Sequence, residues 1–274
     1  MMRLLRQALP HVLLLLGAVW MLMPFVWMVS TAFKAPSEIF DASLWPWPRT
    51  WFGFTHFQDV LKTAPMARFM LNGVIVCAGI LIVQLLVAIP AAYALAKHKF
   101  WGRDTLLLGI LAALTIPIQV TALPLYLGLS ALGWLNTYLA QMLPFFLSMF
   151  AIFLLRQHFK TFPDEILQAA RLDGMTEWEI VWRVVTPSAT PAIAAFSIFS
   201  LVAHWNDLYW PMIVISSTDL APPPLGMLLF ATAESGANYG ALMAGATLIT
   251  APMVLAFLLA RRRFIQGITM SGFR

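Results

Sequence analysis

Apolar residues dominate the chain in six long blocks, separated by shorter polar segments. The blocks are residues 9–29, 69–96, 105–125, 138–155, 192–215 and 239–260. Each is close to the roughly 20 residues that a helix needs to cross the hydrocarbon core of a bilayer. The blocks lack the polar alternation of barrel strands, and backbone groups in lipid must be satisfied within their own segment. The pattern therefore predicts an all-α membrane protein with six transmembrane helices in a single domain that spans residues 1–274.

The segment 161–191, between the fourth and fifth blocks, has a different pattern, with many charges and a small apolar stripe. Asp164 follows Pro163 and predicts a helix start, because an acidic side chain stabilises the exposed N–H groups of a first turn. Gly174 predicts the helix end, because glycine adopts the left-handed conformation without steric cost. The apolar face of this first helix would consist of Ile166, Leu167, Ala169 and Ala170.

A second helix is predicted directly after this turn. Thr176 and Glu179 have the spacing of a capping box, in which each residue satisfies a backbone N–H group near the helix start. We expect the helix to end at Pro187, which cannot donate a hydrogen bond. Its apolar positions would be Ile180, Val181, Val184 and Val185. Such a hairpin is too polar to span the membrane and is apolar on one side, which is typical of a docking surface.

Composition supports a membrane location. Of the 274 residues, 61% are hydrophobic and 11% are charged, whereas soluble domains have about 25% charged residues. Arg3 and Arg6 before the first apolar block are compatible with a signal peptide. That block is too long for one, however, and no cleavage site of small residues follows it, so we expect a retained span. The single cysteine, Cys77, allows no internal disulfide.

The positive charges predict the orientation of the spans. With the N-terminus inside, the inner segments contain most of the 17 Lys and Arg residues, and the outer segments contain only Lys34, Arg49, Lys62 and Arg68. This asymmetry satisfies the positive-inside rule with both termini cytoplasmic. The net charge of +5 is then a topology signal and does not indicate nucleic-acid binding.

The fifth block contains an acidic residue, which is costly in a membrane and seldom faces lipid. Counted from Ala192, Asp207 would lie about 23 Å along the helix, in the outer half of the span. Two interpretations remain open: Asp207 is a hydrogen-bond anchor near the outer interface, or it lines a transport pathway. In the third block, Pro117 interrupts the apolar run, and such breaks are tolerated where helices line a cavity or bond to neighbours.

Two outer segments lie beside these spans. The aromatic residues of segment 30–68 are expected to form an interfacial belt, or else a docking ledge for an external partner. The segment 216–238 is expected to be a polar, proline-rich outer loop.

Catalytic motifs are absent from the sequence. There is no phosphate-binding loop of the form G-x-x-x-x-G-K-[ST], no H-E-x-x-H motif, no Cys/His cluster with metal spacing and no G-x-S-x-G motif. We therefore expect no catalytic residue, no metal ligand and no cofactor bound by this chain.

The hairpin resembles the EAA loop of binding-protein-dependent ABC importer permeases, whose motif reads E-A-A-x3-G-x9-I-x-L-P. The matching positions here are Gln168-Ala169-Ala170, then Gly174, then Val184-Val185-Thr186-Pro187. The spacing is preserved, but Gln168 replaces the leading Glu, and Thr186 replaces the Leu before the proline. Four further stretches resemble the MalG-like carbohydrate-importer branch. They are Thr31-Ala32-Phe33-Lys34, Pro163-Asp164-Glu165, Trp205-Asn206-Asp207 with Trp210-Pro211, and Arg263-Phe264-Ile265-Gln266-Gly267.

The resemblance implies the architecture of a type I importer permease in the bacterial inner membrane. It implies a heterodimer with a second permease subunit, two copies of a cytoplasmic ATPase that uses ATP and Mg, and a periplasmic or extracellular solute-binding protein. The substrate would be a sugar or a derivative, such as an oligosaccharide, glycoside, polyol or glycerol-phosphate. The ATPase would dock on residues of the first hairpin helix and its turn: Glu165, Gln168, Ala169, Ala170, Arg171, Asp173 and Gly174.

Two further expectations depend on this resemblance. Arg171, Asp173 and Glu177 would make ion pairs at the rim of the ATPase contact. The candidate substrate-pathway residues, which would hydrogen-bond to or stack on a sugar, are Gln119, Trp205, Asn206, Asp207 and Tyr209. The alternatives are a self-contained secondary transporter or channel, which would need coupling-ion residues, and a scaffold subunit that moves no solute. Co-purification of an ATPase and a sister permease would separate the importer from the carrier.

Overall fold

A computed structural model describes residues 2–41, 45–233 and 238–272 of the chain, and side chains within 9–41, 45–231 and 238–258. These ranges are almost entirely helical, and they contain no strand beyond one isolated bridge between Lys34 and Trp51. The expected all-α class is therefore confirmed for the part of the chain that is described. Contacts divide the chain into two compact units, one formed by residues 1–67 and 226–252, the other by residues 68–225 and 253–274.

The first unit contains α1 (Met2–Thr31), η1 (Pro36–Glu38) and α2 (Thr55–Thr63), with most of α13 (Pro223–Ala233) and the first part of α14 (Tyr239–Gly272). His56 of α2 is buried, and its Nε2 atom lies 3.0 Å from the carbonyl oxygen of Lys34. Gly240 of α14 lies against the His56 ring, so closely that an added Cβ atom would overlap it. The absence of a side chain at Gly240 therefore allows α14 to begin directly beside α2.

The outer aromatic residues of this unit pack around Phe33. Its ring stacks on Trp51 with a centroid distance of 4.6 Å and also contacts Phe54 and Phe57. Trp51 and Phe54 are both 63% exposed. The cluster thus leaves apolar surface uncovered in this chain, and both an interfacial belt and a docking ledge remain compatible with it.

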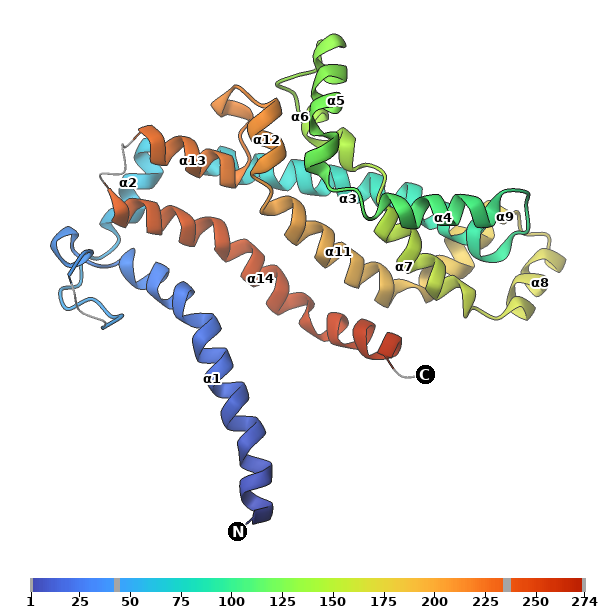
Figure 1. Ribbon diagram of the computed structural model, residues 1–274, viewed down its shortest axis with the longest axis horizontal. Helices are drawn as coiled ribbons and strands as arrows, with labels where there is room; N and C mark the ends of the chain where they lie inside the picture. Colours follow the sequence, from blue (N-terminus) through green and yellow to red (C-terminus); the bar gives the residue numbers. More distant parts are fainter. Residues whose placement is uncertain (1, 42–44, 234–237, 273–274) are drawn as a thin grey trace. The chain divides into compact units, whose positions relative to one another are not determined.

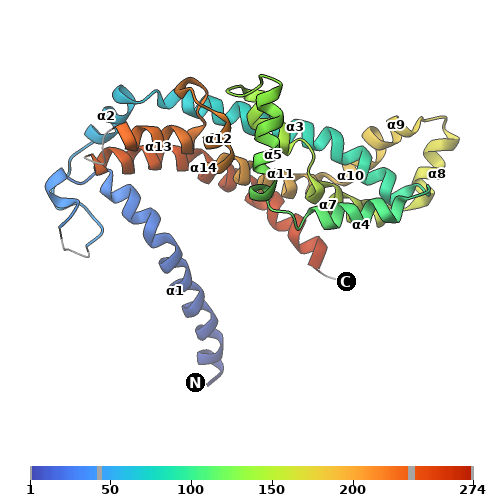
Figure 2. The same cartoon turned by 45° about the horizontal axis from the view of Figure 1, so that its top comes forward.

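The second unit is organised around α3 (Met66–Lys97), which has 32 residues. The other helices of this unit are α4 (Arg103–Ala113), α5 (Ile118–Ala131), α6 (Tyr138–Met142), η2 (Leu143–Phe145), α7 (Met149–Lys160), α8 (Asp164–Leu172), α9 (Glu177–Glu179), η3 (Ile180–Val185), α10 (Thr186–Ser188), α11 (Thr190–Trp205), α12 (Tyr209–Val214) and η4 (Thr218–Leu220). Its main core joins side chains from α3, α7, the segment 167–189 and α11. In Figures 1 and 2, α8 and α9 lie at the same end of this unit as α4.

Three helical stretches among the described residues are long and apolar enough to cross a membrane. They are Leu9–Thr31, Met66–Lys97 and Tyr239–Leu258, which correspond to the first, second and sixth apolar blocks. Three bent helix pairs overlap the remaining blocks: α4 with α5 at 99°, α6–η2 with α7 at 44°, and Glu177–Ser188 with Thr190–Trp205 at 81°. In the third pair only Thr190–Trp205 overlaps the fifth block, because Glu177–Ser188 belongs to the segment 161–191. The number of spans is therefore three, or up to six if each bent pair is one span.

The third apolar block is divided by the chemistry of Pro117. This residue has an extended backbone (φ −71°, ψ 145°) and directly precedes α5. Proline lacks an N–H group and disfavours the helical conformation in the residue before it, so a continuous helix is interrupted there. The interruption predicted at Pro117 is confirmed, and it divides the block into two helices.

The fifth block does not form one helix through Asp207. Helix α11 ends at Trp205, Asn206 has non-helical dihedral angles, and α12 begins at Tyr209. The placement of Asp207 along a continuous helix was therefore wrong. A carboxylate that accepts backbone N–H groups favours a helix start over a helix interior, and Asp207 Oδ1 accepts the backbone N–H of Trp210 at 3.3 Å.

The segment 216–238 is more ordered than the expected polar loop. Pro223 opens α13, because the fixed φ of proline suits a first helical position and its missing N–H is not needed there. Ala221, Pro222 and Pro223 are buried. The expectation of an open polar loop was thus wrong for residues 218–233, and residues 234–237 lie outside the described part.

Candidate functional site

The hairpin 161–191, called the hairpin below, begins and turns as its sequence predicts. Helix α8 starts at Asp164 directly after Pro163, and Gly174 adopts a φ of +82° at the turn. Thr176 and Glu179 form a reciprocal capping box at the start of α9. These local features follow from residue types whose hydrogen-bonding and conformational preferences act over a few positions.

The second helix of the hairpin does not end at Pro187, and this expectation was wrong. It continues through the π-helical segment η3 and through α10 to Ser188, and the chain bends at Ala189. In η3 the backbone N–H of Thr186 bonds to the carbonyl of Val181, five residues earlier, and the Thr186 hydroxyl donates to the same oxygen at 2.7 Å. The wider turn places Pro187 in the first turn of α10, where its missing donor is tolerated.

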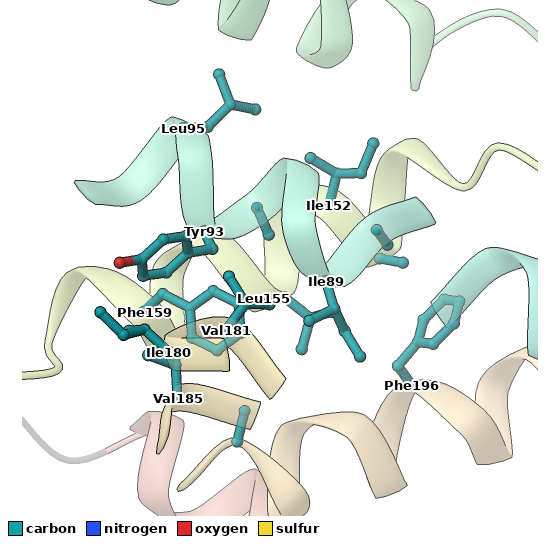
Figure 3. Close-up of a cluster of buried hydrophobic side chains, with 14 of the residues drawn as sticks. Ile89, Tyr93, Leu95, Ile152, Leu155, Phe159, Ile180, Val181, Val185 and Phe196 are labelled. Atoms are coloured by element: carbon teal, nitrogen blue, oxygen red, sulfur yellow. The ribbon is translucent and has the colours of Figure 1, made fainter. Parts of the chain in front are cut away.

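One face of the hairpin is part of the core of the second unit. Leu167 and Ala170 of α8 are 2% and 6% exposed, and Ile180, Val181 and Val185 of η3 are at most 4% exposed. Figure 3 shows the three η3 residues packed with side chains of α7, including Leu155 and Phe159. Ala170 therefore packs against its own chain, and its expected place on an ATPase contact face stays a prediction.

The opposite face of the hairpin is open. The other six candidate docking residues are exposed, namely Glu165, Gln168, Ala169, Arg171, Asp173 and Gly174. Leu172 and Trp178 lie on the same hairpin with exposed fractions of 89% and 62%, and sequence reasoning did not select them. Leu172 is three residues after Ala169 and four after Gln168, so helical periodicity would have placed it on this face. Large apolar side chains exposed among charges mark an interaction surface.

The hairpin is bonded to the last turn of α3 at two points. Lys97 Nζ donates to the carbonyl oxygen of Phe162 and to Asp164 Oδ1, both at 2.6 Å, and the Lys97 side chain is only 8% exposed. The Tyr93 hydroxyl donates to Glu177 Oε2 at 2.8 Å. These three bonds join residues far apart in sequence and connect α3 to the start of α8 and to the start of α9.

Arg171 and Glu177 are paired with each other inside the chain. Arg171 Nε donates to Glu177 Oε1 at 2.6 Å across the Gly174 turn, and His98 Nε2 lies 3.3 Å from Glu177 Oε2. Arg171 and Glu177 thus have an internal partner in this chain and Asp173 is exposed, while rim ion pairs with an ATPase stay a prediction. The hydrogen bond from Arg171 lowers the pKa of Glu177, and the hydrogen bond from Lys97 lowers the pKa of Asp164.

Four of the five pathway candidates lie in the break between α11 and α12. Trp205 is 5% exposed, Asp207 and Tyr209 are half-buried, and Asn206 is exposed with its amide bonded to the carbonyl of Val202. Gln119 is exposed on α5 and makes no hydrogen bond with this group. The hydrogen bond to the N–H of Trp210 supports the anchor interpretation of Asp207 without excluding the pathway interpretation.

A buried polar group that sequence reasoning did not select connects α3 to α11. Gln84 of α3 is 4% exposed, donates to the carbonyl of Phe145 at 2.8 Å and accepts the hydroxyl of Ser200 at 2.7 Å. His204 Nε2 lies 3.4 Å from the Gln84 amide nitrogen. A glutamine within an apolar run was the available signal, since polar groups in spans usually find partners inside the bundle.

A second buried amide holds the segment after α12. Asn72 of α3 is 1% exposed and donates to the carbonyl oxygens of Asp219 and Ala221 at 2.9 and 3.0 Å, while its own oxygen accepts the Tyr138 hydroxyl at 2.6 Å. Nearby, Trp210 is fully buried and donates to the carbonyl oxygen of Ala140. The two Asn72 bonds thus satisfy the backbone oxygens of Asp219 in η4 and of the buried Ala221 directly after it. Among the residues that the structure describes, no group of three or more His, Cys, Asp or Glu is arranged to hold a metal ion.

Comparisons with known proteins agree on one family. Residues 84–269, more than half of the chain, match the model of the "binding-protein-dependent transport system inner membrane component" family. The arabinooligosaccharide transport permease AraQ of Halalkalibacterium halodurans is 35% identical over 201 residues, covering 73% of this chain and 72% of AraQ. The diacetylchitobiose uptake permease NgcG of Streptomyces coelicolor is 30% identical over 275 residues, covering 97% of this chain and 89% of NgcG.

A solved structure shows the same fold. It is the crystal structure of a bacterial ABC transporter involved in the import of the acidic polysaccharide alginate, with a TM-score of 0.82 and 21% identity over 95% of this chain and 96% of that chain. At this identity the likeness establishes the fold alone. The family match and the two permease relatives establish more: the chain belongs to the family of inner membrane components of binding-protein-dependent transport systems, within the carbohydrate branch of ABC importer permeases.

Proposed function

We propose that this chain is one of two permease subunits in an ATP-driven importer that carries a sugar or sugar derivative across the inner membrane. A separate cytoplasmic ATPase supplies the energy by docking on the open face of the hairpin. The observation that carries the proposal is the two-sided burial of the hairpin, with Leu167 at 2% exposure and Leu172 at 89%. The buried side is part of the core of the second unit. The open side would present apolar surface to the ATPase.

The hairpin suits the transfer of force because Leu167 on its buried face and Leu172 on its open face belong to one short helix, α8. Leu167 and Ala170 lie in a core that also contains residues of α3, α7 and α11. A displacement of the hairpin by its partner would therefore be transmitted through this core to helices of the predicted spans. Tight binding alone would shift no equilibrium; the ATPase must contact the hairpin differently in its open and closed states.

The proposed topology has six spans with both termini cytoplasmic. The bent pairs α4 with α5 and α6–η2 with α7 would then each be one crossing, and the third bent pair would contribute a crossing through its part in the fifth block, after the hairpin, added to the three long helices. The excess of Lys and Arg in the proposed inner segments supports this orientation. The partners in this proposal are a sister permease, two ATPase copies that use ATP and Mg, and a solute-binding protein outside the membrane.

The substrate class rests on the relatives and on the chemistry of the break between α11 and α12. The two relatives described above are named for oligosaccharide substrates. Asn206 and Tyr209 carry polar groups at a break in a span, where non-helical backbone is tolerated when it lines a cavity. Asp207 and the buried Trp205 would shape this region, and a contribution from Gln119 of α5 remains part of the proposal.

The docking assignment is tested with Leu172→Asp in a chain co-expressed with its sister permease and ATPase. A charge at this exposed apolar position should reduce the ATPase recovered with the affinity-purified chain by about 10-fold or more, because central apolar anchors dominate interface energy. The control is Thr161→Asp, which adds the same charge at an exposed position outside the predicted docking residues.

Each outcome decides one point. Recovery unchanged in Leu172→Asp would reject this docking face. Failure of the unaltered chain to retain any ATPase would reject the importer proposal as a whole.

A further inference from the structure

The contact between the hairpin and α3 combines an apolar core with a set of directional polar bonds. The polar set, called the clasp below, consists of Tyr93 and Lys97 on α3 and of Asp164 and Glu177 on the hairpin, with the Phe162 carbonyl. The hydrophobic effect is non-directional, and packed helices can slide past one another by small amounts, whereas hydrogen bonds with fixed partners define one register. The clasp therefore fixes where the hairpin sits along α3.

The burial of the clasp differs between its two sides. Tyr93 is 2% exposed and the Lys97 side chain 8%, whereas the side chains of Asp164 and Glu177 are 70% and 46% exposed. The α3 groups are therefore held by packing, and the hairpin carboxylates reach them from the surface. Ion pairs with an exposed partner add little stability, so the fold of the hairpin rests mainly on its buried apolar face.

The Glu177 carboxylate joins three elements. It accepts the Tyr93 hydroxyl of α3 and the Arg171 guanidinium of α8, and it belongs to the first turn of α9. A displacement of α8 is thus passed to α9 and to α3 through the same two oxygen atoms. The second connection, from Lys97, holds the start of α8.

We infer that the clasp is the mechanical link by which movement of the docked hairpin is delivered to α3, with Tyr93 and Lys97 as positioning residues. This inference rests on the proposed function. Its consequence is that loss of the clasp leaves the ATPase docked but disconnects its cycle from the far end of α3. Leu71 lies near that end. It is 26 residues before Lys97, which corresponds to about 39 Å along a helix with a rise of 1.5 Å per residue.

The test uses the complete complex of this chain, its sister permease, the ATPase and the solute-binding protein in lipid nanodiscs. A spin label is placed at Leu71→Cys, a position 57% exposed, in a Cys77→Ser background that removes the one native cysteine. The probe is Mg-ATP with vanadate, which traps the ATPase closed. The readouts are the ATPase content of the complex, the trapped nucleotide and the change in the label spectrum.

The combined change Tyr93→Phe and Lys97→Met removes the clasp donors and keeps the ring and the aliphatic stem. We expect ATPase content and trapped nucleotide to be retained, while the spectral response at residue 71 falls about five-fold or more, the range of an allosteric coupling term. Lys97→Arg, which keeps a charged donor, should recover part of the response. Arg183→Met is the matched control, because it breaks a 3.1 Å pair with Glu179 that stays within the hairpin.

The outcomes separate the inference from the function on which it rests. A full response in the clasp variant, or no response in the unaltered chain, overturns the inference. Loss of ATPase from the clasp variant also overturns it, because the clasp would then support docking only. Absence of ATPase from the unaltered complex rejects the proposed function instead.

Discussion

Ala169 and Ala170 are adjacent in the sequence motif but have opposite surroundings. Ala170 is 6% exposed and packs in the core of the second unit, whereas Ala169 is exposed on α8. Successive residues of a helix point about 100° apart, so two small residues that look equivalent in a motif can serve two purposes. Ala170 keeps space for the core of its own chain, and Ala169 would keep space for the proposed ATPase.

This difference predicts opposite effects of one substitution. Ala170→Trp should overpack the core and lower the free energy of unfolding by about 1–3 kcal/mol or more. Ala169→Trp should leave thermal unfolding nearly unchanged and should reduce the ATPase recovered with the chain. Unfolding in detergent and co-purification, measured on both variants, check the pair; a stable Ala170→Trp protein that loses the ATPase would contradict the assignment of the two faces.

The Lys97–Asp164 pair predicts a measurable titration. The Lys97 hydrogen bond lowers the pKa of Asp164 below its ordinary value of 3.8, so the stabilisation from this pair is present above the unfolded-state pKa. It is lost as the pH falls through the lower pKa of the folded state. Carboxyl ¹³C NMR of labelled aspartate should show Asp164 titrating at a lower pH than 3.8 and moving up towards that value in Lys97→Met. An unchanged titration in this variant would show that Lys97 is not the cause.

At the scale of elements, proline has different effects at different places in the chain. Pro117 ends a helix and starts another, whereas Pro187 is accommodated by the π-helical turn of η3 and Pro223 opens α13. The difference lies in where each missing N–H group falls. In η3, the hydroxyl of Thr186 supplies an additional donor to the carbonyl oxygen of Val181, which gives this side chain a structural role.

Thr186→Val therefore tests the π-helical segment. This change keeps the shape of the side chain and removes the hydrogen bond from its hydroxyl, so we expect a loss of about 1 kcal/mol in unfolding free energy. Thr186→Ser keeps the hydroxyl and should cost less. Denaturant unfolding of the three proteins in the same detergent gives the comparison, and equal stability of Val and Ser variants would argue against this role for the hydroxyl.

At the scale of the whole molecule, much of the apolar surface is uncovered in the isolated chain. The most hydrophobic window of α1 has no buried residue, and the corresponding windows of α3 and α14 are 33% and 22% buried. Such surface requires lipid or another subunit as its partner. The uncovered apolar surface of these helices agrees with a family of inner membrane components of transport systems.

The proposed division of labour predicts the behaviour of the isolated chain. Reconstituted alone in lipid vesicles, it should accumulate no sugar above background, because it carries no nucleotide-binding motif and its proposed motor is a separate subunit. Adding the sister permease, the ATPase, the solute-binding protein and internal Mg-ATP should produce uptake of a radiolabelled oligosaccharide that the binding protein retains. Accumulation by the chain alone would support the secondary-transporter alternative.

The sequence by itself determined the features that arise within about one helical turn or from composition. Apolar content determines the helical class and the three long apolar helices. Local hydrogen bonding and backbone preference determine the start of α8, the turn at Gly174 and the capping box. Tertiary structure decided which side of each helix is buried and which charges are paired within the chain. The burial of Ala170 and the contacts of Glu177 and Asp164 with α3 could not be read from the sequence, because only packing brings Tyr93 and Lys97 of α3 to the hairpin.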